Sequence, residues 1–316
     1  MTSNNINPPA PDRVGGCQTK TKLNMKTMRI IGLAVSVLML ASCVGGMRTN
    51  KLPVNIGFRP VIGHDTRAQE SVPFPEERTF RLWAQKSSNG SLYLNDETIR
   101  YNGKWLASKI WPEDELSFEA CWPTDIPVNF SKSEGIQISN FDCTNGDIDI
   151  LIARTRDDYE IDSLVTLRFD HILSRVEFRM LHSLPSDMSV RLTGLEVIGF
   201  TQAGDYNTRH SRKWSTADYS GSRTVYKAAE GEFIEIPSGK AIYIGEDFYT
   251  IPQECTARVK VDYQVCFADG NWIPQTGDIE SLKSGWEPSK HYTYTLNLQM
   301  DELTSTPAIS TWSNRE

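Results

Sequence analysis

The feature that most constrains the fold of this sequence is an alternation of apolar and polar residues with a period of two. It recurs along almost the whole chain after residue 53, as in Val54/Ile56/Phe58 and, near the end, in residues 292–300. Successive side chains of a β-strand point to opposite faces of a sheet, so this period is typical of strands with one buried face. Apolar residues at helical spacing over the length of a helix are missing from the sequence. The pattern predicts an all-β protein.

Turn-forming residues separate about a dozen such runs, which favours antiparallel sandwiches. That many strands exceeds one seven-stranded sandwich and suits two. The charged stretch 154–163 is the preferred boundary, and residues 183–187 are a second candidate. We therefore expect a signal region at 1–42, an N-terminal β-sandwich at 43–160 and a C-terminal β-sandwich at 161–316.

The first 42 residues have the character of an export signal. A basic stretch at 25–29 precedes a largely apolar run at 30–41. That run is too short to span a bilayer and matches the apolar region of a secretory signal peptide. Translation could instead start at Met25 or Met28. The polar residues 1–24 would then not be part of the protein.

The signal ends in Leu40-Ala41-Ser42-Cys43, which is similar to the lipobox of bacterial lipoproteins. In such proteins the signal is cut before the cysteine, whose thiol carries a diacylglycerol. Two or more acyl chains give stable anchoring. We expect Cys43 to be lipidated, with palmitate as a typical chain, and the protein to be an outer membrane lipoprotein at the cell surface. Ordinary signal cleavage next to a chance cysteine is the alternative.

Charge argues against nucleic acid as a partner. The chain carries 33 basic and 40 acidic residues, and the first 42 residues hold only one of the acidic ones. The exported part is therefore more acidic still and has no basic cluster in its sequence.

Four cysteines remain after Cys43. A Cys121–Cys143 disulfide is open to an exported protein, because turn signals between the two let the chain return. Cys255 and Cys266 lie near opposite ends of one extended segment, some 36 Å apart at about 3.3 Å per residue, and are expected to be unpaired. Neither pair has the spacing of a zinc site.

Catalytic motifs are missing from the sequence, so we expect no enzyme activity, no cofactor and no catalytic metal. His171 continues the apolar face of its strand and is expected in the core. His64 and His210 lie in polar stretches. Residues 140–147 faintly resemble a calcium loop, but a turn before a strand explains them better.

The tryptophans offer a rival function. A row of exposed indoles on a β-sandwich lipoprotein would suit a surface glycan-binding protein of a polysaccharide-uptake system. The candidates are Trp83, Trp105, Trp111, Trp122, Trp214, Trp272 and Trp286.

Three segments together resemble the fimbrillins of Bacteroidales, the Mfa-like subunits of type V pili. One joins residues 149–153 to the run 165–178, which contains Phe169-x-His171 and Leu173-Ser174-Arg175-Val176. Another is Trp286-x-Pro288 followed by the alternating run 292–298, and the third is residues 308–312. With the lipobox these segments span most of the chain. The resemblance implies two transthyretin-like, Greek-key sandwich domains and a fimbrial subunit that serves cell adhesion.

The resemblance also implies assembly by strand exchange with other pilus subunits. In stalk subunits a protease removes an N-terminal strand, often after an arginine, and a neighbour's strand fills the groove. Here the candidate strand is 54–59, with Val54, Ile56 and Phe58 on its apolar face. Arg67, in the polar stretch 63–70, is the preferred cut site and Arg59 the second. An uncut, solvated Arg67 is the alternative.

The C-terminal residues 301–316 offer no clear donor strand. We expect a last strand of the second domain with Trp312 packed on a core, and therefore an accessory or tip subunit before a stalk subunit. A host or bacterial surface receptor or glycan is a further possible partner of a tip subunit.

Overall fold

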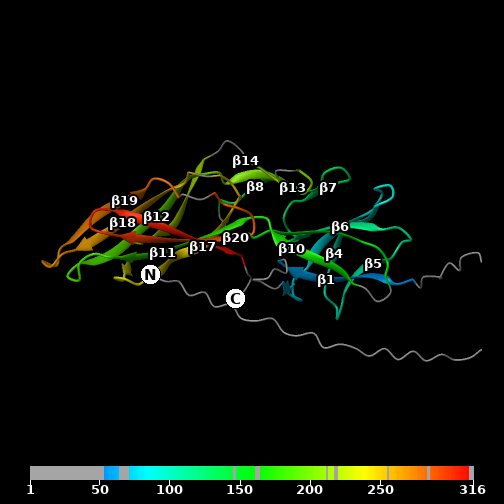
Figure 1. The fold of residues 1–316 in the computed structure, drawn as a ribbon, viewed down its shortest axis with the longest axis horizontal. Helices are drawn as coiled ribbons and strands as arrows, with labels where there is room; N and C mark the ends of the chain where they lie inside the picture. The colour runs from blue at the N-terminus through cyan, green and yellow to red at the C-terminus, as the bar shows by residue number, and fades with distance from the viewer. Residues whose placement is uncertain are drawn as a thin grey trace, which may run out of the picture. The chain divides into compact units, whose positions relative to one another are not determined.

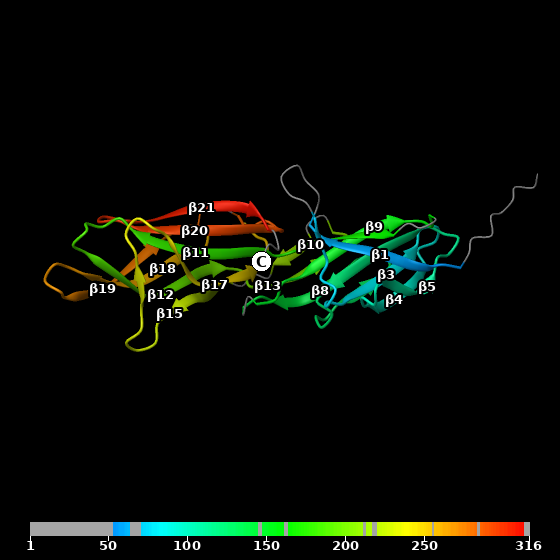
Figure 2. The same ribbon diagram turned by 90° about the horizontal axis from the view of Figure 1, so that it is seen from below.

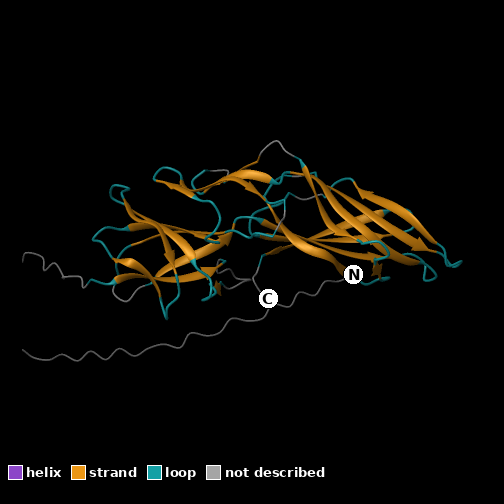
Figure 3. Cartoon of the chain, turned by 180° about the vertical axis from the view of Figure 1, so that it is seen from behind, coloured by secondary structure: helices purple, strands orange, loops and turns teal. Residues whose placement is uncertain are grey.

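The computed structural model describes residues 53–312, apart from 64–70, 145–146, 161–163, 211–212, 217–219, 255 and 283–284. These residues form 21 strands, and no helix occurs among them (Figures 1 and 3). Residues 52–316 make one compact unit. The all-β class predicted from the period of two is confirmed.

The largest sheet, sheet A, runs in the order β2-β1-β10-β9-β6-β3-β4, with β5 also pairing with β1. Its antiparallel ladders are joined by one parallel ladder, between β1 and β10. Since β1 and β10 are far apart in sequence, a parallel pairing through a long connection is available to them. The strands are β1 (Asn55–Ile62), β2 (Val72–Pro73), β3 (Phe80–Lys86), β4 (Leu92–Ile99), β5 (Trp105–Ile110), β6 (Leu116–Trp122), β9 (Leu151–Asp157) and β10 (Val165–His171).

One face of sheet A is buried throughout, and the other is buried only over β3, β6 and β9. One face holds a core cluster drawn almost entirely from strands of the sheet itself, which therefore curls around it. The other face packs against a second sheet, sheet B, through a separate cluster that includes Cys121, Ile152 and Tyr206. Sheet B has the order β14-β13-β8-β7 and consists of β7 (Asn129–Ser131), β8 (Gly135–Asp142), β13 (Ala203–Asn207) and β14 (Trp214–Thr216).

The C-terminal half is a sandwich of two further sheets around a third cluster. Sheet C has the order β17-β11-β20-β21, and sheet D has the order β15-β12-β18-β19 with β16 on β12. In Figure 2, β21 borders β20 on the side away from β11. The strands of sheet C are β11 (Ser174–His182), β17 (Ile242–Thr250), β20 (Lys290–Leu298) and β21 (Leu303–Thr311). Those of sheet D are β12 (Ser189–Phe200), β15 (Gly221–Lys227), β16 (Ile234–Ile236), β18 (Arg258–Cys266) and β19 (Trp272–Ile279).

The sheet pairings cross the expected boundary at residues 160/161. β10 lies beyond it and hydrogen-bonds to β1 and β9, while β13 returns to pair with β8 and carries β14 on its other side. Grouped by sheets alone, the chain passes from sheet A to sheet C between His171 and Ser174. The two-domain division itself stays a prediction.

Candidate functional site

The candidate removable strand, residues 54–59, overlaps the first part of β1. The first half of β1 pairs with β5 and its last two residues pair with β2, while Phe58–Ile62 pairs with β10 on the other side. Ile56 and Phe58 are buried in the core of sheet A, whereas Val54, just before the strand, is exposed. The ring of Phe58 meets the rings of Phe80 and Phe118 edge-on, at centroid distances of 6.4 and 5.8 Å. β1 is thus an interior strand, although it comes first in the described chain.

Two exposed leucine side chains, Leu164 and Leu106, lie close to the backbone on the outer face of β1 at Gly57. A Cβ atom on Gly57 would lie 2.7 Å from Cδ2 of Leu164 and 3.6 Å from Cδ2 of Leu106. Both leucines are about half exposed. The bare backbone at Gly57 therefore lets Leu164 close over the strand.

The two candidate cut sites differ in setting. Arg59 lies within β1, opposite Thr166 in the register with β10, and its Nη2 donates a 2.9 Å hydrogen bond to Thr166 Oγ1. Arg67 falls between β1 and β2 in the chain. Both Arg67 and Cys43 lie outside the described residues.

The last strand, β21, has the opposite character. It pairs along its whole length with β20, from Leu298↔Leu303 to Lys290↔Thr311, at the edge of sheet C. From Thr306 onwards its residues are exposed, Ile309 among them. Leu303 packs against the core cluster of sheets C and D. The strand contributes backbone pairing but little buried apolar surface.

Trp312 fixes the end of β21. Its indole is 5% exposed and lies parallel to the ring of His171 at a centroid distance of 3.7 Å, with Tyr249 stacked at 5.0 Å. Its backbone N donates to the carbonyl of Ser289. Since His171 belongs to β10 and Tyr249 to β17, this one side chain ties the C-terminal strand to both halves of the chain.

His171 itself is buried, as the sequence predicted. Its Nδ1 lies 2.8 Å from Oδ2 of Asp149, whose side chain is 13% exposed. Asp149 lies just before β9, which starts at Leu151, and its carboxylate faces His171 of β10.

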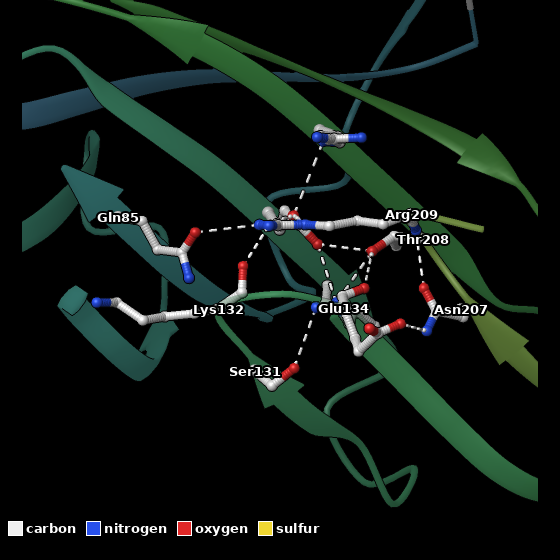
Figure 4. Close-up of polar contacts among 10 residues, drawn as sticks. Gln85, Ser131, Lys132, Glu134, Asn207, Thr208 and Arg209 are labelled. Carbon is white, nitrogen blue, oxygen red and sulfur yellow. Dashed lines mark hydrogen bonds and ion pairs between the residues drawn. The ribbon is translucent and has the colours of Figure 1, made fainter. Parts of the chain in front are cut away.

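A buried polar network joins sheet A to sheet B (Figure 4). Glu119 of β6 is 1% exposed and accepts hydrogen bonds from Ile136 N (2.9 Å), Thr208 Oγ1 (2.8 Å) and Arg209 Nη2 (2.9 Å). Arg209 also donates to Gln85 Oε1 and to the carbonyl of Lys132. Every partner of the carboxylate is a fixed donor, so the network positions the chain after β13 and offers no free catalytic group.

The Cys121–Cys143 disulfide that the sequence left open does not form: both residues are buried free thiols. Cys121 lies in sheet A, whereas Cys143 follows β8 and its thiol donates to the carbonyl of Gln202 at 3.1 Å. Burial raises the pKa of Cys121 to about 12 and also raises the pKa of Cys143, so both stay protonated. Cys266 is a half-buried free thiol, and Cys255 lies outside the described residues.

The glycan platform does not form, because none of the seven candidate tryptophans is exposed. Trp83, Trp105, Trp111 and Trp286 are buried, and the other three are half-buried. Trp83 stacks on Phe130, and Trp122 lies under the guanidinium of Arg78. Among the described residues no group of three potential metal ligands comes together, and no helix is long and apolar enough to cross a membrane.

Together the fold and these contacts define a β-sandwich protein whose notable features are its first and last strands. The model of the fimbrillin-like family matches residues 66–312, so the chain belongs to the fimbrillin-like family. It is a fimbrial protein of the cell surface, structural and non-enzymatic.

Solved structures share this fold at low identity. A fimbrial protein from Bacteroides vulgatus is 14% identical, with a TM-score of 0.57 over 82% of this chain and 100% of that one. A candidate cell adhesion protein from Bacteroides ovatus is 14% identical, with a TM-score of 0.52 over 84% and 100%. One from Bacteroides uniformis is 11% identical, with a TM-score of 0.51 over 82% and 98%. No curated protein matches the chain.

Proposed function

We propose that this chain is a lipid-anchored accessory or tip subunit of a fimbrium, that it accepts a neighbour's strand in place of β1, and that it serves cell adhesion. The observation that carries the proposal is the position of β1 inside sheet A. Its removal would leave one edge of β10 unpaired and would leave β5 and β2 without their partner, above an apolar core. Such a groove binds an extended strand through main-chain hydrogen bonds and alternate side chains.

The preferred cut site is Arg67. Cleavage there leaves β1 attached only by its pairing, since Arg67 follows the strand in sequence. Arg59 is held in the β1–β10 ladder, and a protease needs an extended segment free of such pairing. We therefore rank Arg59 second.

The pairing of the last strand, β21, supports a place for this subunit at the end of the fibre. A stalk subunit must give a strand away, whereas here β21 is paired along its length and ends in the buried Trp312. A subunit that accepts a strand and keeps its own fits the end of a fibre. Membrane attachment through lipid on Cys43 belongs to the form before assembly.

The test is the N-terminal sequence and intact mass of protein from sheared surface assemblies and from the membrane fraction. We expect a form that begins at Ala68 in the sheared material and a form acylated at Cys43 in membranes. Arg67→Ala should abolish the first form, whereas Arg59→Ala, the matched control, should leave it. Recovery of only monomeric, acylated protein from wild-type membranes would refute strand exchange.

A further inference from the structure

A cavity of about 470 Å³ opens at one end of the sandwich formed by sheets C and D. The end of β11 and the first residues of β12, β17 and β19 border it, together with the chain through and after β16. The volume lies in the range of about 300–1,000 Å³ that small-molecule sites have. Eight steps of about 3.3 Å along β11 put His182, which lines the cavity, roughly 26 Å from Ser174, where the chain enters sheet C.

An apolar floor and one indole shape the cavity. Val190 and Ile236 of the lining are buried, and the half-buried Trp272 forms a side wall. The guanidinium carbon of Arg191 lies 3.8 Å from the ring centroid of Trp272 and 3.8 Å from that of Phe233, so the cation is held between two aromatic faces. A cation over a ring face is attracted by the ring electrons. This stack fixes the indole, which presents a rigid apolar surface to the cavity.

One carboxylate supplies the charge of the lining. Among the described residues that line the cavity, Glu235 is the only acidic or basic one apart from His182. Its side chain is 77% exposed, and its Oε1 lies 3.9 Å from Nη2 of Arg191. That distance is too long for a hydrogen bond, so the carboxylate keeps its lone pairs for a ligand. The guanidinium nevertheless offsets part of its charge, so the cavity does not select for a cation.

Three neutral groups add hydrogen-bond donors. His182 is buried, and its Nδ1 accepts a 3.3 Å hydrogen bond from Leu184 N, which leaves the ring proton on Nε2. Burial lowers the pKa of His182, so the ring is neutral at physiological pH. The hydroxyls of Ser189 and Ser238 have no hydrogen-bond partner among the described residues. The cavity therefore offers donors and acceptors together, above an apolar floor.

We propose that this cavity binds one uncharged sugar unit of a surface glycan. A pyranose ring has apolar C–H faces that pack on a fixed indole, and hydroxyls that both donate and accept hydrogen bonds. An acidic sugar would bring its carboxylate against Glu235, and a lysine side chain would leave the donors of His182 and the serines unpaired. One half-buried indole is enough for such a site, which needs no row of exposed ones. Reading the cavity as a receptor site rests on the adhesive function proposed above, but sugar binding itself needs only the monomer.

The first measurement is saturation-transfer difference NMR of the full-length protein with the methyl glycosides of glucose, galactose, mannose and N-acetylglucosamine, followed by calorimetric titration of the best binder. We expect saturable binding of at least one of the four, and at least tenfold weaker binding of glucuronate and of N-acetyl-lysine amide. Glu235→Gln and Trp272→Leu should each weaken binding of the glycoside about tenfold, because one removes a charged acceptor and the other the ring surface. Glu235 is exposed, so its variant changes the site and leaves the core intact.

The matched control is Glu232→Gln, which removes the same charge from an exposed position three residues earlier, outside the lining. It should bind as the wild type does. Absence of saturable binding by all four glycosides, equal losses in Glu232→Gln and Glu235→Gln, or tighter binding of glucuronate or of the lysine amide would each overturn the proposal. Sugar binding by a protein that yields no cut form in sheared material would keep the cavity and remove strand exchange, so the two proposals fail separately.

A second measurement needs no variant. The best-binding glycoside should slow the oxidation of Trp272 by N-bromosuccinimide in the wild-type protein, read by peptide mass spectrometry, while Trp122 of sheet A, also half-buried, serves as an internal reference. Unchanged oxidation of Trp272 at saturating glycoside would contradict binding at this place.

Discussion

The first and last strands of the described chain, β1 and β21, are held in opposite ways. β1 is an interior strand with its apolar side chains in the core, whereas β21 is an edge strand whose second half is exposed. β1 is stabilised by burial along its length, and β21 by backbone pairing and by the single side chain of Trp312. The strand proposed to leave is thus the better buried one. Its departure requires both a cut in the chain and a replacement strand of similar apolar pattern.

The largest effect should come from Phe58→Ala. This change empties a site between Phe80 and Phe118 and should lower the free energy of unfolding by about 3–5 kcal/mol. Ile309→Ala, on the exposed part of β21, should change it by less than about 0.5 kcal/mol. Urea unfolding of both variants measures the contrast, and equal losses would remove the distinction between the two strands.

Trp312→Ala should cost somewhat less, about 3 kcal/mol, because the indole lies at a chain end where neighbours relax. Hydrogen exchange should then accelerate in β21 and remain unchanged in β1. Trp312→Phe is the conservative control and should restore most of the protection. Unchanged exchange in β21 of Trp312→Ala would show that backbone pairing alone holds the strand.

A smaller effect is expected at Gly57. Gly57→Ala places a Cβ 2.7 Å from Leu164 Cδ2, and since that atom ends a flexible side chain, the cost should be about 1–2 kcal/mol. The double variant with Leu164→Ala should recover most of the loss relative to Leu164→Ala alone, measured as a double-mutant cycle. Additive losses would mean that Leu164 does not restrict the outer face of β1.

The smallest effect expected is a pH dependence of the free energy of unfolding that comes from His291 of β20. Burial lowers the pKa of His291, against the opposing influence of Glu177; Arg175, Arg179 and Asp247 also face it. The unfolded chain therefore takes up the proton first, so stability should fall as the pH drops below about 6.5. Urea unfolding at pH 7.5 and 5.5 should show a smaller loss for His291→Gln than for the wild type. An unchanged pH dependence in His291→Gln would assign the effect to other groups.

Strand positions could be predicted from the sequence because burial on one face of a sheet leaves a local signature. Val165/Leu167/Phe169/His171 alternates in the sequence and becomes β10, with all four residues buried. The inward positions of β1 follow from the same rule. The candidate cut sites Arg59 and Arg67 came from a resemblance and from local polarity, and they stay predictions.

The pairing of strands was not predictable in the same way. Alternation says that residues 165–171 form a strand, but it does not say that this strand joins β1 in parallel. The free thiols of Cys121 and Cys143 illustrate the same limit, since turn signals between them allowed a return of the chain that the two strands do not make.

The sequence by itself determined the all-β class, the inward faces of the strands and the absence of recognisable catalytic motifs, because each depends on residues close together in the chain. The tertiary structure alone decided that β1 is interior, that Trp312 stacks on His171, and that Cys121 and Cys143 stay unpaired. These depend on contacts between distant segments, whose partners are chosen by the packing of the whole fold and not by any local pattern.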